Sequence, residues 1–196
     1  IRLLAEGLES GRVASAPQQN EYYQLMVREC RRLSALIENV LDFTRIERGR
    51  KVYDFAPVDV NALMNHTVQL MTQPAAEKQI SLRLELPPAD PPMPEPCWDG
   101  QAMQQALVNL VDNALKHAPP GTVVTLGLEW KPGVVTLWVQ DQGEGISDEL
   151  RPRLFEPFQR GGDELRRRTP GVGIGLSIVK HIIESHHGVI AIQTRP

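Results

Sequence analysis

The spacing of apolar residues changes along the chain, and this change constrains the fold more than any other feature of the sequence. Between Tyr22 and Val40 the apolar positions recur at intervals of four, four, three, four and three residues, which is typical of one face of a long helix. Between Ile80 and Leu86 every second residue is apolar, which is the pattern of a strand with one covered face. The sequence therefore predicts a helical N-terminal part followed by a part built around a sheet.

A shorter helix is predicted before the long one. Ile1, Leu4 and Leu8 are spaced three and four residues apart, and the segment 10–17 interrupts this pattern. Two helices joined by a short break form an αα-hairpin, which we place at residues 1–48. A lone hairpin cannot bury its stripe on both sides, so we expect it to pack against a second copy in a four-helix bundle. The alternative is that it lies on its own second domain.

The second predicted domain, residues 49–196, alternates between strand and helix patterns. One strand is expected directly after a hinge at 48–55, and further strands at 80–86, 123–130, 134–141 and 189–194. Helices are expected at 59–73, at 101–117 and from 174 to a C′ glycine at Gly188. This order predicts an α+β sandwich with one mixed sheet and helices on one face. His186 and His187 end the last helix, where an imidazolium ion suits the helix dipole.

Composition restricts the classes of partner. The chain has 196 residues, 41% of them hydrophobic and 23% charged, as in a soluble globular protein. Its formal net charge of -3 gives no reason to expect a nucleic-acid partner. Two cysteines, Cys30 and Cys97, form no metal-ligand spacing and favour a reducing compartment. No apolar run is long enough to cross a bilayer.

One candidate site lies on the helix predicted at 101–117. Asn109, Asn113 and Lys116 are four and three residues apart, so they share one helix face. Amide oxygens suit a Mg²⁺ ion that is shared with phosphates and water, and a lysine adds a positive charge for phosphate oxygens. The alternative is two surface amides and a solvated lysine.

A second candidate site follows the strand predicted at 134–141. Three apolar residues of that strand share the parity of Asp141, so we expect its carboxylate to point inward. A buried carboxylate needs hydrogen-bond donors, and the amino group of a purine is one. Gly143 and Gly145 would let the backbone approach a flat ring closely. Alternatively, Asp141 starts a turn and binds its own backbone.

A third candidate site is a run of glycines, Gly171, Gly173 and Gly175, directly before the last predicted helix. The run lacks the G-x-G-x-x-G spacing and preceding strand of a dinucleotide site, and it lacks the lysine of a P-loop. Backbone N–H groups at a helix N-terminus still form a good seat for an oligophosphate.

Taken together and in this order, these segments resemble the conserved boxes of bacterial sensor histidine kinases. "NLVDNALKHA" (109–118) resembles the N box and "DQGEGI" (141–146) the G1 box. "FEPFQR" (155–160) resembles the F box and "GVGIGLSIVK" (171–180) the G2 box. Residues 33–49 resemble the second helix of the dimerisation and phosphotransfer hairpin.

The resemblance implies the ATP-binding sandwich shared by gyrase, Hsp90, histidine kinases and MutL, with ATP and Mg²⁺ as cofactors. Asn113 would hold the Mg²⁺ ion and Asp141 the adenine amino group, while Phe155 and Phe158 would anchor a lid. The implied nucleotide-binding residues are Asn109, Asn113, Lys116, His117, Asp141, Gly143, Gly145, Ile146, Phe155, Phe158, Gly171, Gly173, Gly175 and Leu176.

The resemblance also implies a histidine kinase of a two-component system. The γ-phosphoryl group of ATP would pass to a histidine on the hairpin and then to an aspartate of a response-regulator receiver domain. The hairpin would form a homodimer, and the chain would be the cytoplasmic part of an inner-membrane sensor, attached to the membrane only through segments before Ile1. The phosphoacceptor histidine belongs upstream of Ile1, because none of His66, His117, His181, His186 and His187 has the required acidic and proline neighbours. We therefore expect this chain to bind ATP without phosphorylating itself.

Three other functions share some of these features. A clamp ATPase of the same fold carries a glutamate four residues before the Mg²⁺ asparagine, whereas this chain has Asn109, which cannot accept a proton at neutral pH. A serine kinase of the anti-sigma type shares the boxes but leaves the hairpin unexplained. A non-catalytic dimeric scaffold is the third alternative, and Mg²⁺-dependent ATP binding distinguishes the kinase from it.

Overall fold

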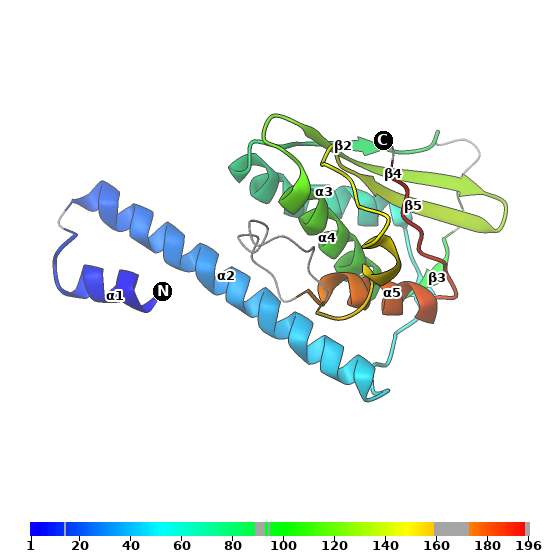
Figure 1. Ribbon diagram of the computed structural model, residues 1–196, viewed down its shortest axis with the longest axis horizontal. Helices are drawn as coiled ribbons and strands as arrows, with labels where there is room; N and C mark the ends of the chain where they lie inside the picture. Colours follow the sequence, from blue (N-terminus) through cyan, green and yellow to red (C-terminus); the bar gives the residue numbers. More distant parts are fainter. Residues whose placement is uncertain (14, 89–92, 94, 159–172, 195–196) are drawn as a thin grey trace. The chain divides into compact units, whose positions relative to one another are not determined.

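In the computed structural model the chain divides between Gly49 and Arg50 into two units. The structure describes residues 1–13, 15–88, 93, 95–158 and 173–194 (Figure 1). The first unit is entirely helical, as its spacing of apolar residues predicts, and the second contains every strand that the structure describes.

Helices α1 (Arg2–Glu9) and α2 (Ala16–Glu47) form the first unit. Pro17 stands in the first turn of α2, where its missing N–H leaves no hydrogen bond unmade. The two helices pack on each other, and Gly7 admits the ring of Tyr22, because a Cβ at Gly7 would lie 3.4 Å from Tyr22 Cε1. The predicted helical hairpin is confirmed.

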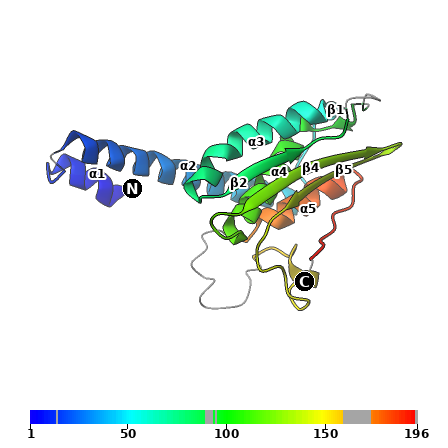
Figure 2. The same cartoon turned by 90° about the horizontal axis from the view of Figure 1, so that it is seen from above.

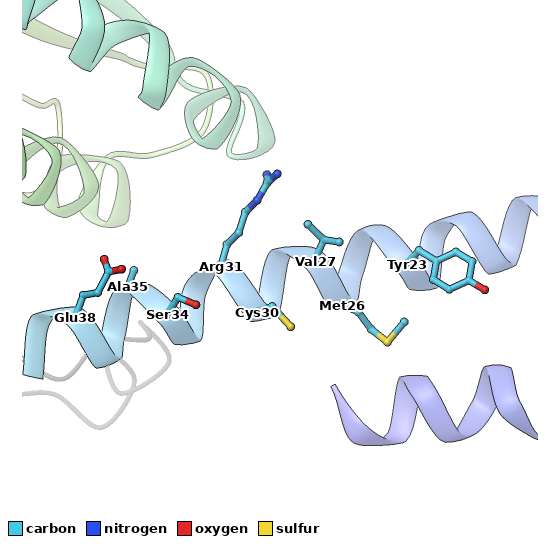
Figure 3. A pocket seen from close by; sticks show the side chains of 8 residues that line it. All are labelled: Tyr23, Met26, Val27, Cys30, Arg31, Ser34, Ala35 and Glu38. Atoms are coloured by element: carbon cyan, nitrogen blue, oxygen red, sulfur yellow. The ribbon is translucent and has the colours of Figure 1, made fainter.

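Much of the apolar stripe of α2 is exposed. Leu33, Ile37 and Val40 all belong to the predicted stripe, and Ile37 is 52% exposed. The middle of the helix, from Tyr23 to Glu38, bears a shallow groove whose apolar lining includes Tyr23 and Val27 (Figure 3). An apolar face of this length that is left open within its own unit is typical of a surface that another helix covers.

The second unit is a mixed sheet with helices on one face (Figures 1 and 2). Its elements are β1 (Ala56–Pro57), α3 (Val60–Glu77), β2 (Ser81–Glu85), β3 (Cys97–Trp98), α4 (Gly100–His117), β4 (Val123–Lys131), β5 (Val134–Gln140), the short 3-10 helix η1 (Arg151–Arg153) and α5 (Gly175–Ser185). The strand order is β2-β4-β5, with β2 parallel and β5 antiparallel to β4. The predicted α+β architecture is confirmed. The strand predicted after the hinge at 48–55 is β1, and it pairs with β3, a two-residue strand that the sequence patterns do not predict.

Aspartates start the two longest helices of this unit. Asp59 Oδ1 accepts a hydrogen bond from Ala62 N, and Asp99 Oδ1 accepts one from Ala102 N, each at 2.9 Å. Each bond satisfies an N–H group that has no partner within the helix. Helix α3 continues to Glu77, four residues beyond the predicted end, with Pro74 inside it.

The core lies between the sheet and the helices. Its fully buried side chains include Met64, Leu107, Leu126 and Ile178. Thr67 is also buried, and its hydroxyl donates to Leu63 O and accepts from Gln104 Nε2, both at 2.8 Å. This side chain joins α3 to α4 with its hydrogen-bonding capacity used.

The strand predicted at 189–194 is wrong. These residues alternate in exposure as a strand would, but they form no ladder with β5 or with any other described strand. Thr194 Oγ1 instead accepts a hydrogen bond from Ile146 N at 3.4 Å. Alternation reports which side chains face the protein, whereas a strand also needs a backbone partner.

The prediction that Gly188 is the C′ residue of α5 is also wrong. Gly188 N donates to Ile183 O and His187 N donates to Glu184 O, which is a Schellman ending. The left-handed position of this ending, with a φ of 59°, is occupied by His187. Gly188 serves another purpose, since a Cβ there would lie 2.9 Å from Ile183 Cγ2.

Candidate functional site

One face of α4 carries the polar residues predicted from the sequence. Asn109, Asn113 and Lys116 share this face and are half-buried. Lys116 Nζ forms an ion pair with Asp112 Oδ2 one turn earlier, so its charge is shared with a carboxylate instead of pointing alone at a ligand. The sequence reasoning missed Asp112, although an acid four residues before a lysine is the spacing of such a pair.

Asn109 meets the start of α5. Its Nδ2 atom is buried and has no hydrogen-bond partner among the described residues. A Cβ at Gly175, the first residue of α5, would lie 3.5 Å from Asn109 Oδ1, so the glycine lets the amide lie directly against the helix start. A buried donor without a partner costs about 1–3 kcal/mol. That cost indicates a position at which a ligand supplies the missing acceptor.

The N-cap residue of α5 makes no side-chain cap. This residue, Ile174, is buried and supplies no side-chain hydrogen bond to the first turn. The first backbone N–H groups of a helix then lack partners within the helix, and their dipoles favour an anion. Leu176, also predicted to line the site, lies half-buried in this first turn.

Phe158 and Gly173 meet beside this helix start. Phe158 N donates to Gly173 O at 2.8 Å, and Gly173 adopts a φ of 77°. Phe155 is half-buried, whereas the Phe158 side chain is 61% exposed. Phe158 is therefore joined to Gly173 through its backbone. Gly171 lies outside the described residues.

The predicted inward orientation of Asp141 is wrong. Strand β5 ends at Gln140, and the Asp141 side chain is exposed. Its Oδ1 atom accepts a hydrogen bond from Gly143 N at 2.7 Å, which is the turn geometry considered as the alternative. The second carboxylate oxygen has no partner among the described residues. This oxygen can accept from a ligand without breaking a bond in the protein.

The loop that begins at Asp141 lies directly on the C-terminal end of α4. A Cβ at Gly143 would be only 2.8 Å from His117 O, which only a glycine avoids. Gly145 has a φ of 76°, which also favours glycine, and the half-buried Ile146 follows it. The side chain of His117 is exposed at this junction.

Helix α4 therefore brings the predicted segments together. Asn109 contacts the start of α5, His117 contacts the loop 141–146, and Asn113 and Lys116 lie between them on the same helix. At 1.5 Å per residue, Asn109 and His117 are about 12 Å apart along the helix axis. This length fits one extended ligand with a flat group at one end and anionic groups at the other.

A further lysine lies at the end of α4. Lys78, which follows α3, donates from Nζ to Leu115 O at 3.0 Å. Burial lowers the pKa of Lys78 below its ordinary value, the carboxylate of Asp112 opposes this shift, and Lys116 adds to it. The charge of Lys78 is therefore influenced by both members of the Lys116–Asp112 ion pair.

The metal-binding capacity of this site rests on amides. The described residues contain no group of three or more His, Cys, Asp or Glu that could hold a metal ion by themselves. The side chain of Asn113 makes no hydrogen bond within the described part of the chain, so its oxygen is available. An ion that takes few protein ligands and shares phosphates and water, as Mg²⁺ does, fits this donor set.

No helix among the described residues is long and apolar enough to span a membrane.

Two family models match the chain. Residues 98–196 match the histidine kinase-, DNA gyrase B- and HSP90-like ATPases, and residues 1–49 match the His Kinase A (phospho-acceptor) domain. The chain belongs to the family of histidine kinase-, DNA gyrase B- and HSP90-like ATPases. The resemblance inferred from the four boxes is confirmed.

The relatives are sensor histidine kinases. The sensor-like histidine kinase SenX3 of Mycolicibacterium smegmatis is 30% identical over 100% of this chain and 50% of its own length. The crystal structure of full-length ShkA in complex with AMPPNP matches with a TM-score of 0.67 and 30% identity, over 87% of this chain and 34% of ShkA. The histidine kinase ThkA in complex with the response regulator protein TrrA has the same fold, with a TM-score of 0.61 at 21% identity over 95% of this chain and 51% of ThkA. The chain thus spans about half the length of SenX3 and a third of ShkA.

Proposed function

We propose that this chain is the catalytic part of a two-component sensor histidine kinase and that it binds Mg-ATP along α4. The observation that carries the proposal is the buried Nδ2 of Asn109, which has no partner among the described residues and lies at the start of α5, where Ile174 supplies no side-chain cap. A polar donor and the backbone N–H groups of a helix start converge there, and an oligophosphate can accept from both.

The chain's own residues bind and orient the nucleotide in this proposal. The N–H groups that begin α5, together with Lys116, face the phosphates, and the exposed carboxylate oxygen of Asp141 accepts from the adenine amino group. Asn113 would hold Mg²⁺, with Asn109 close by on the same helix. The bound ion would supply positive charge against the phosphates. Gly143 and Gly145 let the backbone lie close to the purine.

The phosphoacceptor and the partners belong to the same proposal. A histidine on the hairpin, in a segment before Ile1, receives the γ-phosphoryl group, and an acidic neighbour serves as its general base. The exposed stripe of α2, including Leu33 and Ile37, forms the homodimer. The response-regulator partner is proposed by analogy with the ThkA complex, and the cytoplasmic location by analogy with the sensor relatives.

A clamp ATPase of the same fold is less well supported. Hydrolysis needs a base that activates water, and the position that carries a glutamate in such enzymes is Asn109 here. Its amide cannot take up a proton at neutral pH. Phosphoryl transfer to a histidine needs no base at this position, because the proposed general base lies beside the acceptor histidine on the hairpin.

Calorimetric titration with ATP, with and without Mg²⁺, tests the proposal. We expect binding that requires Mg²⁺ and that is weakened at least tenfold, about 1.4 kcal/mol, by Asp141→Asn. The matched control is Asp148→Asn, which removes an exposed carboxylate that pairs with Arg151 and not with α4. Wild-type chain that shows no heat and no thermal shift with Mg-ATP would refute the nucleotide site.

Phosphoryl transfer requires a second experiment on a longer chain that includes the residues before Ile1. We expect an acid-labile, base-stable phosphate on that chain after incubation with radiolabelled Mg-ATP, and none on the present chain. Release of inorganic phosphate without labelled protein would favour the ATPase instead.

A further inference from the structure

The C-terminal end of α5 is held by a histidine that the proposed nucleotide site does not use. His186 Nδ1 lies 2.7 Å from Ile182 O, and His186 Nε2 lies 3.0 Å from Asp99 N. A carbonyl oxygen only accepts and an amide N–H only donates, so Nδ1 carries a hydrogen and Nε2 carries none. Both bonds together require a neutral imidazole, contrary to the imidazolium predicted from the helix dipole.

Asp99 is the centre of this arrangement. Its Oδ1 atom accepts from Ala102 N and starts α4, while its Oδ2 atom accepts from Asp54 N at 3.0 Å. Asp54 belongs to the segment 51–55, which follows the hairpin in the chain. The backbone and side chain of one residue therefore connect α5, α4 and this segment.

Aromatic rings of the same segment pack against the imidazole. The ring of Phe55 lies 4.8 Å from the His186 ring, and the ring of Tyr53 lies 5.2 Å from it in an edge-on arrangement. Tyr53 also approaches His181 at 6.2 Å, and Lys51 lies over the Tyr53 ring. Segment 51–55 is thus held to the end of α5 by rings and to Asp99 by a hydrogen bond.

We propose that His186 is a positioning residue that fastens segment 51–55 to α4 and α5 only while its imidazole is neutral, so that protonation of His186 detaches the segment. A proton on Nε2 would point at the Asp99 N–H group, and two donors cannot share that position. Histidine is the side chain whose charge changes within the physiological pH range. The proposal goes beyond nucleotide binding and does not depend on it.

The neighbouring charges do not remove this effect. Of the titratable residues around His186, Tyr53 packs its ring on the imidazole and Asp99 donates its N–H group to it. Lys51 and His181 approach the ring of Tyr53, and Glu184 pairs with Lys180. A hydrogen on Nε2 could reach the Asp99 carboxylate only if Nε2 left the Asp99 N–H group and competed with Asp54 N for Oδ2. Either movement loosens the attachment.

Segment 51–55 directly follows the hairpin, and α4 and α5 carry the residues of the proposed nucleotide site. Attachment by His186 therefore lets one proton alter the connection between the segment that leads from the hairpin and the two helices. The consequence for a kinase is a pH-dependent restraint on the linker.

NMR on the labelled chain tests this proposal. The ring nitrogens report the tautomer and titration of His186, and amide hydrogen exchange, corrected for the intrinsic rate, reports protection of the Asp54 and Asp99 N–H groups. Between about pH 8 and about pH 5, we expect both protections to fall on the order of fivefold, as for loss of one hydrogen bond. The fall should follow the titration of His186.

Two variants separate this titration from others. In His186→Gln the glutamine amide oxygen can accept from the Asp99 N–H group at either pH. We therefore expect the protection of the Asp99 N–H group in this variant to be independent of pH. His66→Gln removes an exposed histidine on α3 and should keep the wild-type pH dependence. Protection that stays constant while His186 titrates, a hydrogen on Nε2 at pH 8, or an unchanged pH dependence in His186→Gln would each overturn the proposal.

If His186→Gln fails to fold, coincidence of the two titrations in the wild-type chain decides the matter alone. Mg-ATP titration of the same sample keeps the two proposals apart. A chain that does not bind ATP but shows this coincidence would refute the proposed function and leave the role of His186 standing.

Discussion

Replacing Gly143 with alanine tests whether the loop 141–146 must lie directly on α4. The new Cβ would lie 2.8 Å from His117 O and 2.8 Å from Asp141 Oδ1, whereas ordinary van der Waals contact begins at 3.4 Å. The Asp141 side chain can rotate away, but the His117 carbonyl belongs to the backbone at the end of a helix and cannot. The loop must therefore retreat from α4 by several tenths of an ångström.

Two quantities should change. Overpacking of this kind costs about 1–3 kcal/mol of unfolding free energy. The movement also strains the bond from Gly143 N to Asp141 Oδ1, which orients the carboxylate proposed to bind adenine. We expect the affinity for Mg-ATP to fall at least tenfold, about 1.4 kcal/mol. Urea unfolding measures the first quantity and isothermal titration calorimetry the second.

Gly100→Ala is the matched control for Gly143→Ala. A Cβ at Gly100 would lie 3.5 Å from Val58 Cγ2, which is an ordinary contact, and the residue begins α4. Because alanine is the better helix former, we expect this variant to be neutral or more stable by up to about 1 kcal/mol. Wild-type stability and affinity in Gly143→Ala would refute the reasoning. Reduced stability with unchanged affinity would show that the loop packs on α4 but does not contact the nucleotide.

Two further predictions concern the ends of helices. His187→Gly should raise the unfolding free energy by about 0.5–1 kcal/mol, because glycine tolerates the left-handed φ of 59° at this position; thermal melts compare it with His187→Ala, which should show no gain. The folded-state pKa of Lys78 lies below its unfolded value, so the unfolded chain binds more protons between these two values and stability rises with pH across that window. Urea titrations at several alkaline pH values should show a smaller rise of the unfolding free energy with pH in Lys78→Gln, a variant that keeps a donor for Leu115 O. An identical rise in the wild-type chain and the variant would exclude Lys78 as the source of this pH dependence.

Local patterns predicted the elements well, because they depend on residues close in sequence. A spacing of three and four residues identified α2 and α4, and strict alternation identified β2. The shared face of Asn109, Asn113 and Lys116 follows from helix geometry alone. Four ordered motifs then indicated the family, which the match over residues 98–196 confirms.

Contacts between distant residues could not be predicted in the same way. Parity along β5 indicated an inward Asp141, but the strand ends one residue earlier and the carboxylate turns to Gly143 N. The helix dipole favoured a charged His186, yet Asp99, 87 residues away in sequence, supplies an N–H that only a neutral ring can accept. In both cases a single hydrogen bond outweighed a local preference.

The sequence by itself determined which segments are helices and strands, which polar residues share a helix face, and to which family the chain belongs. Only the tertiary structure decided that the start of α5 leaves Asn109 with a buried donor, that Gly143 lies on the last carbonyl of α4, and that His186 joins three segments. The reason is that periodicity records how much of a side chain is covered. The partner that covers it, and the direction of each hydrogen bond, depend on which distant backbone groups the fold places beside it.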